Sequence, residues 1–355
     1  MYGALALLML VALATGVEHA TIVGLISAVC TFIIAHAIYR FVRFLYIYDV
    51  FYDHFNIHRK TKRIDQYKTT KDGRQPWAFV TNVDNALGRG FAEKLAELGF
   101  NIVLHCHELE DLTKVRTELE RQYPSRCFEG FLMGCKTFVP DHRGRAERIA
   151  DWALWVEHGV NHLALKVFVN CTGLVDKPLN QPTIFDNASA IDIEMTSNRY
   201  VVSPIVLTSA VTRLLAKEGS ALMINIESIN DSIDFSRPMY RLNRSFLRSI
   251  TRRMAWERKA MEQDVDVLGI TAGPIAGVGN NKRSSLLRPS VETFVIASLR
   301  RVGCGEMTII PYFWHAVMAW LTSRIPKSWR TSSGKWKASR STETLGKGYD
   351  DHQYW

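Results

Sequence analysis

Cysteine is scarce in this sequence and lacks the paired spacing that metal sites need. The six cysteines among 355 residues are scattered, with no C-x-x-C pair. This pattern argues against a zinc site and a disulfide framework, and it fits a reducing compartment. Acidic residues are outnumbered, so the net charge is +9. The positive residues are dispersed or flank apolar segments, which favours a membrane surface over nucleic acid as a partner.

The composition sets the broad class of the protein. Hydrophobic residues make up 47% of the chain and charged residues 22%. These fractions exclude a disordered chain and a polytopic membrane protein. A length of 355 residues gives room for one large α/β domain with appendages.

Charge is absent from two N-terminal apolar runs, residues 3–17 and 20–39. The second run meets the requirement of about 20 apolar residues for a spanning helix, whereas the first could span only with strain or lie re-entrant. No basic region precedes the first run, which argues against a cleaved signal peptide. Arg40, Arg43 and the basic run 59–63 follow, and the positive-inside rule then places the rest of the chain in the cytosol.

Apolar strand-like runs alternate with amphipathic segments from Trp77 onward. Such alternation predicts an α/β fold with a Rossmann-type, doubly wound parallel sheet. Ligands of these sheets bind at the carboxyl ends of the strands, where Asn82, Cys171, Ser228 and Gly273 fall. The expected strands are 77–81, 101–105, 128–133, 163–170, 221–228 and 265–273, and the expected helices are 88–100, 109–122, 147–158, 210–219 and 246–261.

Tyr240 and Arg244 have the spacing of neighbours on one helix face. A free phenol has a pKa of about 10, and a fixed cation beside it favours the phenolate, so the tyrosine can exchange protons near neutral pH. Ser228 lies upstream, at the end of an apolar run. This combination is typical of a ketone reductase, although Tyr-x-x-x-Arg alone has little specificity.

These residues resemble the short-chain dehydrogenase/reductase superfamily, and within it the membrane-bound very-long-chain 3-oxoacyl-CoA reductases, especially the fungal ones. Those enzymes are relatives of the 17β-hydroxysteroid dehydrogenases. The resemblance runs from about Trp77 to Leu321. Its most specific parts are residues 282–303 and 309–320, for which it implies substrate binding and membrane contact.

The glycine-rich turn T-G-x-x-x-G-x-G of the family corresponds to residues 81–88. Thr81 and Gly88 are kept, while Asn82 and Ala86 replace glycines and Leu87 lies between Ala86 and Gly88. Asn82 can adopt a left-handed conformation, but Ala86 adds a methyl group where backbone should approach phosphate. The resemblance implies that these five residues bind the cofactor.

Other cofactor positions are also altered. His107 stands where NADPH-using relatives have an arginine for the 2′-phosphate. The end of the second expected strand, 101–105, has no acidic residue, which favours NADPH over NADH. Cys135 replaces the aspartate expected near the adenine. Asn170, Cys171 and Gly173 keep half of N-N-x-G, and Gly273 and Pro274 match the motif after the sixth strand. The proton-relaying asparagine falls near Tyr200, with Asn198 two residues away.

The resemblance assigns the catalytic roles to Ser228, Tyr240 and Arg244. Ser228 would orient the carbonyl, and Tyr240 would donate the proton. Tyr240 follows Ser228 by twelve residues where thirteen is usual. Arg244 replaces the lysine that lowers the tyrosine pKa and binds the nicotinamide ribose, with a planar and permanently charged group.

The sequence therefore predicts NADPH-dependent reduction of 3-oxoacyl-CoA in very-long-chain fatty-acid elongation, at the endoplasmic reticulum membrane and facing the cytosol. The predicted partners are a long-chain acyl-CoA, membrane lipid and other elongation subunits. Two alternatives stay open: a catalytically silent relative that acts as a binding or scaffold subunit, and a ketoreductase for a sterol or secondary-metabolite ketone.

We expect five segments along the chain. The segment 308–321 is predicted as a membrane-dipping amphipathic helix, with a core helix as the alternative. The five segments are a membrane anchor (1–52), a basic linker (53–76), an NAD(P)-binding Rossmann domain (77–280), a substrate- and membrane-associated segment (281–325) and a disordered basic tail (326–355).

Overall fold

The protein is described here by a computed structural model. It describes residues 19–48, 64–132, 154–171, 193, 197–228, 238–278 and 283–324, with the backbone alone at residues 19, 20, 22, 199, 200, 228, 238–245, 323 and 324. The chain divides into two compact units, Met1–Lys60 and Thr61–Trp355, which are treated separately below.

The N-terminal unit contains the helix α2 (His19–Ile47). Its stretch Val23–Ile47 has 25 residues and is apolar enough to cross a membrane. At about 1.5 Å per residue this stretch exceeds the hydrocarbon thickness of about 30 Å. The second apolar run is thus confirmed as helical, and the helix continues through Arg40 and Arg43. The first run, 3–17, lies outside the described residues.

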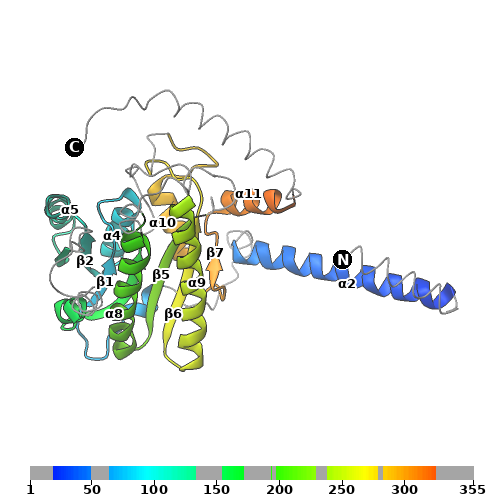
Figure 1. The fold of residues 1–355 in the computed structure, drawn as a ribbon, viewed down its shortest axis with the longest axis horizontal. Coiled ribbons are helices and arrows are strands. Elements are labelled where there is room, and N and C mark those ends of the chain that lie inside the picture. Colours follow the sequence, from blue (N-terminus) through cyan, green and yellow to red (C-terminus); the bar gives the residue numbers. More distant parts are fainter. Residues whose placement is uncertain are drawn as a thin grey trace. The chain divides into compact units, whose positions relative to one another are not determined.

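The second unit is built on a parallel sheet with the order β3-β2-β1-β4-β5-β6-β7 (Figure 1). The chain starts in the middle, moves to one edge and returns to build the other half, which confirms the Rossmann-type fold. The strands are β1 (Pro76–Val80), β2 (Asn101–Cys106), β3 (Phe128–Leu132), β4 (Ala164–Asn170), β5 (Ala221–Ser228), β6 (Val265–Ala272) and β7 (Thr308–Ile309).

Helices cover both faces of this sheet. On one face α8 and α9 lie side by side over β4, β5 and β6, and on the other α4 and α5 cover β1, β2 and β3, with α10 against α4 (Figure 1). Residues 154–160 are also helical. The named helices are α4 (Ala86–Glu97), α5 (Leu109–Gln122), α8 (Ser203–Glu218), α9 (Pro238–Ala260), α10 (Val291–Arg300) and α11 (Phe313–Arg324). Two short helical turns are named as well, η1 (Ile64–Lys68) and η4 (Asn198–Val202).

Local sequence explains where several of these elements begin and end. α8 stops at Gly219, whose φ of 62° is left-handed and favours glycine. α9 begins at Pro238, the first helical position, where a missing N–H costs nothing. It therefore starts eight residues before the expected residue 246 and includes Tyr240 and Arg244. α10 and β7 were not expected, and Thr308 and Ile309 are strand residues instead of the start of a helix.

The main core lies between the sheet and the helices over β4 and β5. Phe79, Phe168 and Leu165 of the sheet pack with Leu207 and Val211 of α8. β1, β2 and β4 are buried along their whole length, as expected for central strands of a parallel sheet covered on both faces.

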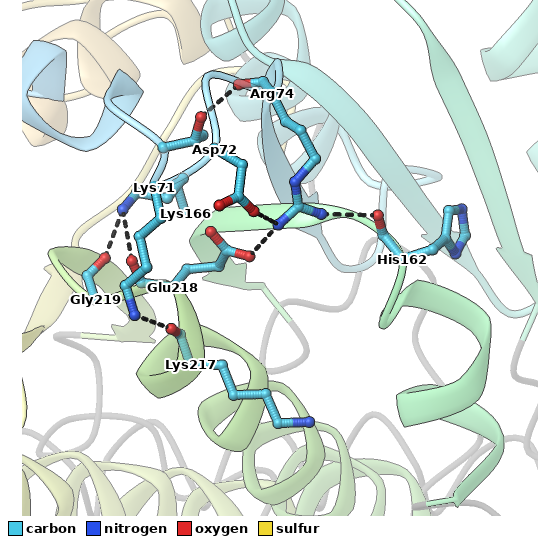
Figure 2. Close-up of polar contacts among 9 residues, drawn as sticks. Lys71, Asp72, Arg74, His162, Lys166, Lys217, Glu218 and Gly219 are labelled. Carbon is cyan, nitrogen blue, oxygen red and sulfur yellow. Dashed lines mark hydrogen bonds and ion pairs between the residues drawn. The ribbon is translucent and has the colours of Figure 1, made fainter.

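Lysines bind the C-terminus of α8 at the end of the sheet where the strands begin. Lys166, on β4, is 1% exposed, and its Nζ donates to the carbonyl oxygens of Gly219 at 2.5 Å and Glu218 at 3.4 Å. Lys71 donates to the carbonyl of Lys217 (Figure 2). Cations here complement the negative end of the helix dipole. Burial nevertheless lowers the pKa of Lys166, because desolvation disfavours the charged form.

The segment that leads into β1 is fastened to the same end of the domain. Tyr67 is fully buried, and its hydroxyl donates to Asp266 Oδ2 at 2.6 Å. Arg74 pairs with Glu218 at 2.8 Å and donates to the carbonyl of His162 at 3.1 Å (Figure 2). Residues 64–75, predicted to be linker, are thus packed against the Rossmann domain.

Candidate active site

The turn after β1 connects two strand ends of the sheet. Thr81 is fully buried, and its Oγ1 accepts a hydrogen bond from the Cys171 N–H at 2.8 Å. The Thr81 N–H donates to the carbonyl of Val169 at 3.0 Å. The side chain therefore joins the β1 turn to the end of β4, so that both loops occupy one edge.

Asn82 adopts the left-handed conformation that the sequence predicted for it, with φ of 53°. Its backbone N–H donates to His105 Nδ1, on β2, at 3.3 Å. That nitrogen can accept only when it carries no proton. The Asn82 side chain is 3% exposed, and its Oδ1 has no hydrogen-bond partner among the described residues.

The start of α4 lies directly against this turn. A Cβ on Gly88 would lie 2.2 Å from the Asn82 carbonyl oxygen, so only glycine permits the close approach. Ala86 is the first residue of α4, and the Leu87 N–H donates to Asn85 Oδ1 at 2.8 Å. The helix N-terminus thus faces the carboxyl edge of the sheet, where the helix dipole favours an anion.

The end of β2 carries two histidines around a buried thiol. The rings of His105 and His107 meet edge to face, with centroids 5.1 Å apart. Cys106 lies between them in sequence and is fully buried. Burial raises the pKa of Cys106 to about 12, so it is a neutral thiol and not a nucleophile.

The end of β4 faces α8 and the π-helical turn η4. Asn170 is fully buried, and its Nδ2 donates to Thr208 Oγ1 on α8 at 3.4 Å. Burial also raises the pKa of Cys171. Asn198 begins η4 and is 3% exposed, and π-helical turns are frequent at functional sites. Tyr200, near which the proton-relaying asparagine was expected, lies in the same turn. Gly173 and Cys135 lie outside the described residues.

The predicted catalytic residues come from β5 and α9. Ser228 is the last residue of β5, and Tyr240 is the third residue of α9. Because α9 runs back along the sheet, its N-terminus lies at the edge where β5 ends. The backbone therefore brings Ser228 and Tyr240 to one edge, with Arg244 one turn further along the helix.

Sequence reasoning missed a buried ion pair beside Ser228. Glu227 is 1% exposed, and Arg248 Nε donates to its Oε2 at 2.9 Å. Desolvation raises the pKa of Glu227, while Arg248 and Thr251 oppose the rise. The only sequence pattern that could have indicated this ion pair was an N-I-E-S run with an arginine about 20 residues later. Nothing in the sequence showed that the glutamate points into the interior.

The turn after β6 is supported from α11. A Cβ on Gly273 would lie 2.7 Å from His315 Nδ1, so the imidazole packs directly on the Gly273 backbone. His315 is fully buried, with Nε2 3.3 Å from the Leu287 carbonyl oxygen. Burial lowers the pKa of His315, which favours the neutral ring. Pro274 follows Gly273, so His315 supports the backbone of this turn from α11.

Comparisons with known proteins identify relatives of this chain. The family model for short chain dehydrogenases matches residues 76–286. A very-long-chain 3-oxoacyl-CoA reductase of Mycosarcoma maydis is 28% identical over 269 residues, covering 73% of this chain and 72% of that protein. A protein of the same name from Neurospora crassa is 25% identical over 252 residues, covering 69% and 71%.

Solved structures show the same fold. A short-chain dehydrogenase from Sphingobium yanoikuyae, in complex with NADPH, is 16% identical with a TM-score of 0.53, covering 79% of this chain and 98% of that chain. A 7β-hydroxysteroid dehydrogenase is 16% identical with a TM-score of 0.59, covering 74% and 98%. The family match covers more than half of the chain, and the sheet order agrees with it. The chain therefore belongs to the short-chain dehydrogenase family.

Proposed function

We propose that the protein is an NADPH-dependent ketoreductase that converts 3-oxoacyl-CoA to 3-hydroxyacyl-CoA in very-long-chain fatty-acid elongation. The observation that carries the proposal is the convergence of Ser228, the start of α9 with Tyr240, and the Asn82 turn at one edge of the sheet. The names of the relatives from Mycosarcoma maydis and Neurospora crassa support the substrate class.

The residues at this edge fit a dinucleotide. The N-terminus of α4 follows β1 through a left-handed residue, which is how this fold presents backbone N–H groups to a pyrophosphate. The buried Asn82 Oδ1, without a partner among the described side chains, can accept a hydrogen bond from a bound hydroxyl. Asn82, Ala86, His107, Asn170 and Gly273 would line the cofactor, and Thr81, Leu87 and Gly88 would shape the turn.

The chemistry that bound NADPH supplies is hydride transfer to the carbonyl carbon. Ser228 and Tyr240 hydrogen-bond the carbonyl oxygen and orient it, and Tyr240 then gives its phenolic proton to that oxygen. Arg244, one helical turn from Tyr240, stabilises the phenolate left behind. The product is a secondary alcohol.

Turnover by purified protein tests this function. Oxidation of NADPH should depend on added C18–C24 3-oxoacyl-CoA, and Tyr240→Phe should lower kcat by at least about 100-fold, because the proton donor is lost. Tyr39→Phe on the N-terminal helix is a matched control that should leave the rate unchanged. Equal rates for wild type and Tyr240→Phe would refute the proposal.

A catalytically silent scaffold is the second candidate, and the altered cofactor positions favour it. Ala86 occupies the first residue of α4, and Arg244 stands where the family has lysine. Direct titration with NADPH separates the two candidates, since a silent subunit need not bind it. A dissociation constant in the micromolar range would count against the scaffold.

We propose the endoplasmic reticulum membrane as the location, with the catalytic domain facing the cytosol. The length and apolar surface of α2 support membrane lipid as a partner, and the chemistry calls for a long-chain acyl-CoA. Other elongation subunits are proposed partners of the same complex. Protease protection of microsomes tests the orientation, since residues 64–324 should be digested without detergent.

A further inference from the structure

Glu227 is a buried carboxylate in the residue directly before Ser228. It is 1% exposed and pairs with Arg248 of α9, whose side chain is 34% exposed. Burying a carboxylate costs several kcal/mol before pairing, and an apolar pair of similar volume is often as stable. Stability alone therefore gives little reason for this pair.

The neighbouring residues of β6 and α9 leave room for the Glu227 carboxylate and add a second polar contact beside it. A Cβ on Gly269 of β6 would lie 3.0 Å from Glu227 Oε1, so glycine leaves the room that the carboxylate needs. On α9, Thr251 Oγ1 accepts from Asn225 Nδ2 at 3.0 Å. β5 and α9 are thus joined by two adjacent polar contacts.

These contacts lie at a fixed distance from the predicted catalytic residues. Arg248 follows Arg244 by four residues and Tyr240 by eight, which is about one and two helical turns on the same face. Glu227 precedes Ser228 on a strand held in register with β6. A shift of α9 along β5 would change the separation of Tyr240 from Ser228 directly.

We infer that Glu227 and Arg248 are positioning residues that fix α9 along β5 and so set Tyr240 and Arg244 at the correct height beside Ser228; this inference rests on the proposed ketoreductase function. The interval between Ser228 and Tyr240 is one residue shorter than is usual for the family, so the helix depends on its own contacts with the sheet for its position.

The titration of Tyr240 in the full-length protein in detergent tests this inference without turnover. Tyrosinate absorbance is recorded against pH, and the Tyr240→Phe trace is subtracted to isolate one phenol. We expect Glu227→Gln to raise the pKa of Tyr240 by about one unit, because a shifted α9 takes the phenolate away from the Ser228 hydroxyl that stabilises it, whereas loss of the Glu227 charge alone would lower that pKa. We also expect kcat to fall at least about tenfold at neutral pH. The KM for 3-oxoacyl-CoA, measured at saturating NADPH, should change less.

Two further variants separate positioning from folding. Glu227→Met combined with Arg248→Leu removes both charges and keeps the packing volume, so it should keep the melting temperature but not the Tyr240 titration. Arg253→Met, on an exposed part of α9, is the matched control and should change neither. An unchanged Tyr240 titration and kcat in Glu227→Gln and in the double variant would overturn the inference. A shifted titration in a protein that turns over no 3-oxoacyl-CoA would uphold the positioning role and refute the proposed function.

Discussion

At the scale of single residues, Asn82 shows how this chain forms the first βα turn without the usual glycine. The turn needs a positive φ, and asparagine is the side chain other than glycine that adopts it most readily. The hydrogen bond from its N–H to His105 adds a fixed contact from the neighbouring strand. Sequence could predict the conformation of Asn82, but the contact with His105 joins residues 23 positions apart and needed the sheet register.

Replacing Asn82 should therefore separate conformation from side-chain chemistry. Asn82→Ala should lower the free energy of unfolding by about 1–2 kcal/mol, because alanine resists the left-handed region. Asn82→Gly should keep the stability within about 0.5 kcal/mol, yet weaken NADPH binding through the loss of Oδ1. Urea unfolding and NADPH titration measure the two effects. Equal stability of the two variants would contradict this account.

His315 predicts a pH dependence of stability. Its folded pKa is lowered by burial, so below the ordinary histidine pKa of about 6.5 the unfolded chain binds a proton that the folded protein does not. The contribution to stability is complete above that value and is lost as the pH falls towards the lower folded pKa. His315→Gln should flatten this slope in melts between about pH 5 and 7. Parallel slopes in wild type and His315→Gln would rule out this role.

At the scale of elements, the strands were predictable and the helix boundaries less so. Six strands fall within two residues of their expected ends, because continuous apolar runs between turn residues mark buried strands. The start of α9 was missed although Pro238 marks it, since residues 241–245 are polar apart from Leu242 and hide the helical period. β7 has two residues, too few for any pattern.

The packing between β5, β6 and α9 can be tested at Gly269. A methyl group there would meet Thr308 Cγ2 at 2.8 Å and Glu227 Oε1 at 3.0 Å. Gly269→Ala should therefore destabilise the protein by about 1–3 kcal/mol, as overpacking does. Gly159→Ala, in the helix 154–160, has its nearest neighbour at 3.4 Å and should be neutral or stabilising by up to about 1 kcal/mol. Thermal melts of both variants give the comparison.

At the scale of the whole molecule, the division into units predicts where the chain can be shortened. Removal of residues 1–60 should leave a folded protein that binds NADPH, because the sheet and its core lie beyond Thr61. Removal of residues 1–75 should lower the melting temperature by several degrees, because Tyr67 and Ile64 are buried in the domain. Circular dichroism melts check both, and equal melting temperatures would show that η1 contributes nothing.

The residues of the candidate site could be located from sequence, but the residues that hold them in place could not. The residues at strand ends were found because parallel strands present their carboxyl ends at one edge. Glu227, Arg248 and His315 act through contacts between elements that no local pattern records. The predicted domain boundaries stay predictions, and the tail from residue 326 lies outside the described residues.

The attachment of residues 64–75 has a mechanical consequence. Any tension on the chain N-terminal to Ile64 first reaches the domain through Tyr67, Lys71 and Arg74, whose partners belong to β6, α8 and the segment before β4. These contacts lie where the strands begin, and the candidate site lies where they end. A force applied from that side therefore acts on the central sheet at the end where the strands begin. It does not act directly on the residues that would hold the substrate.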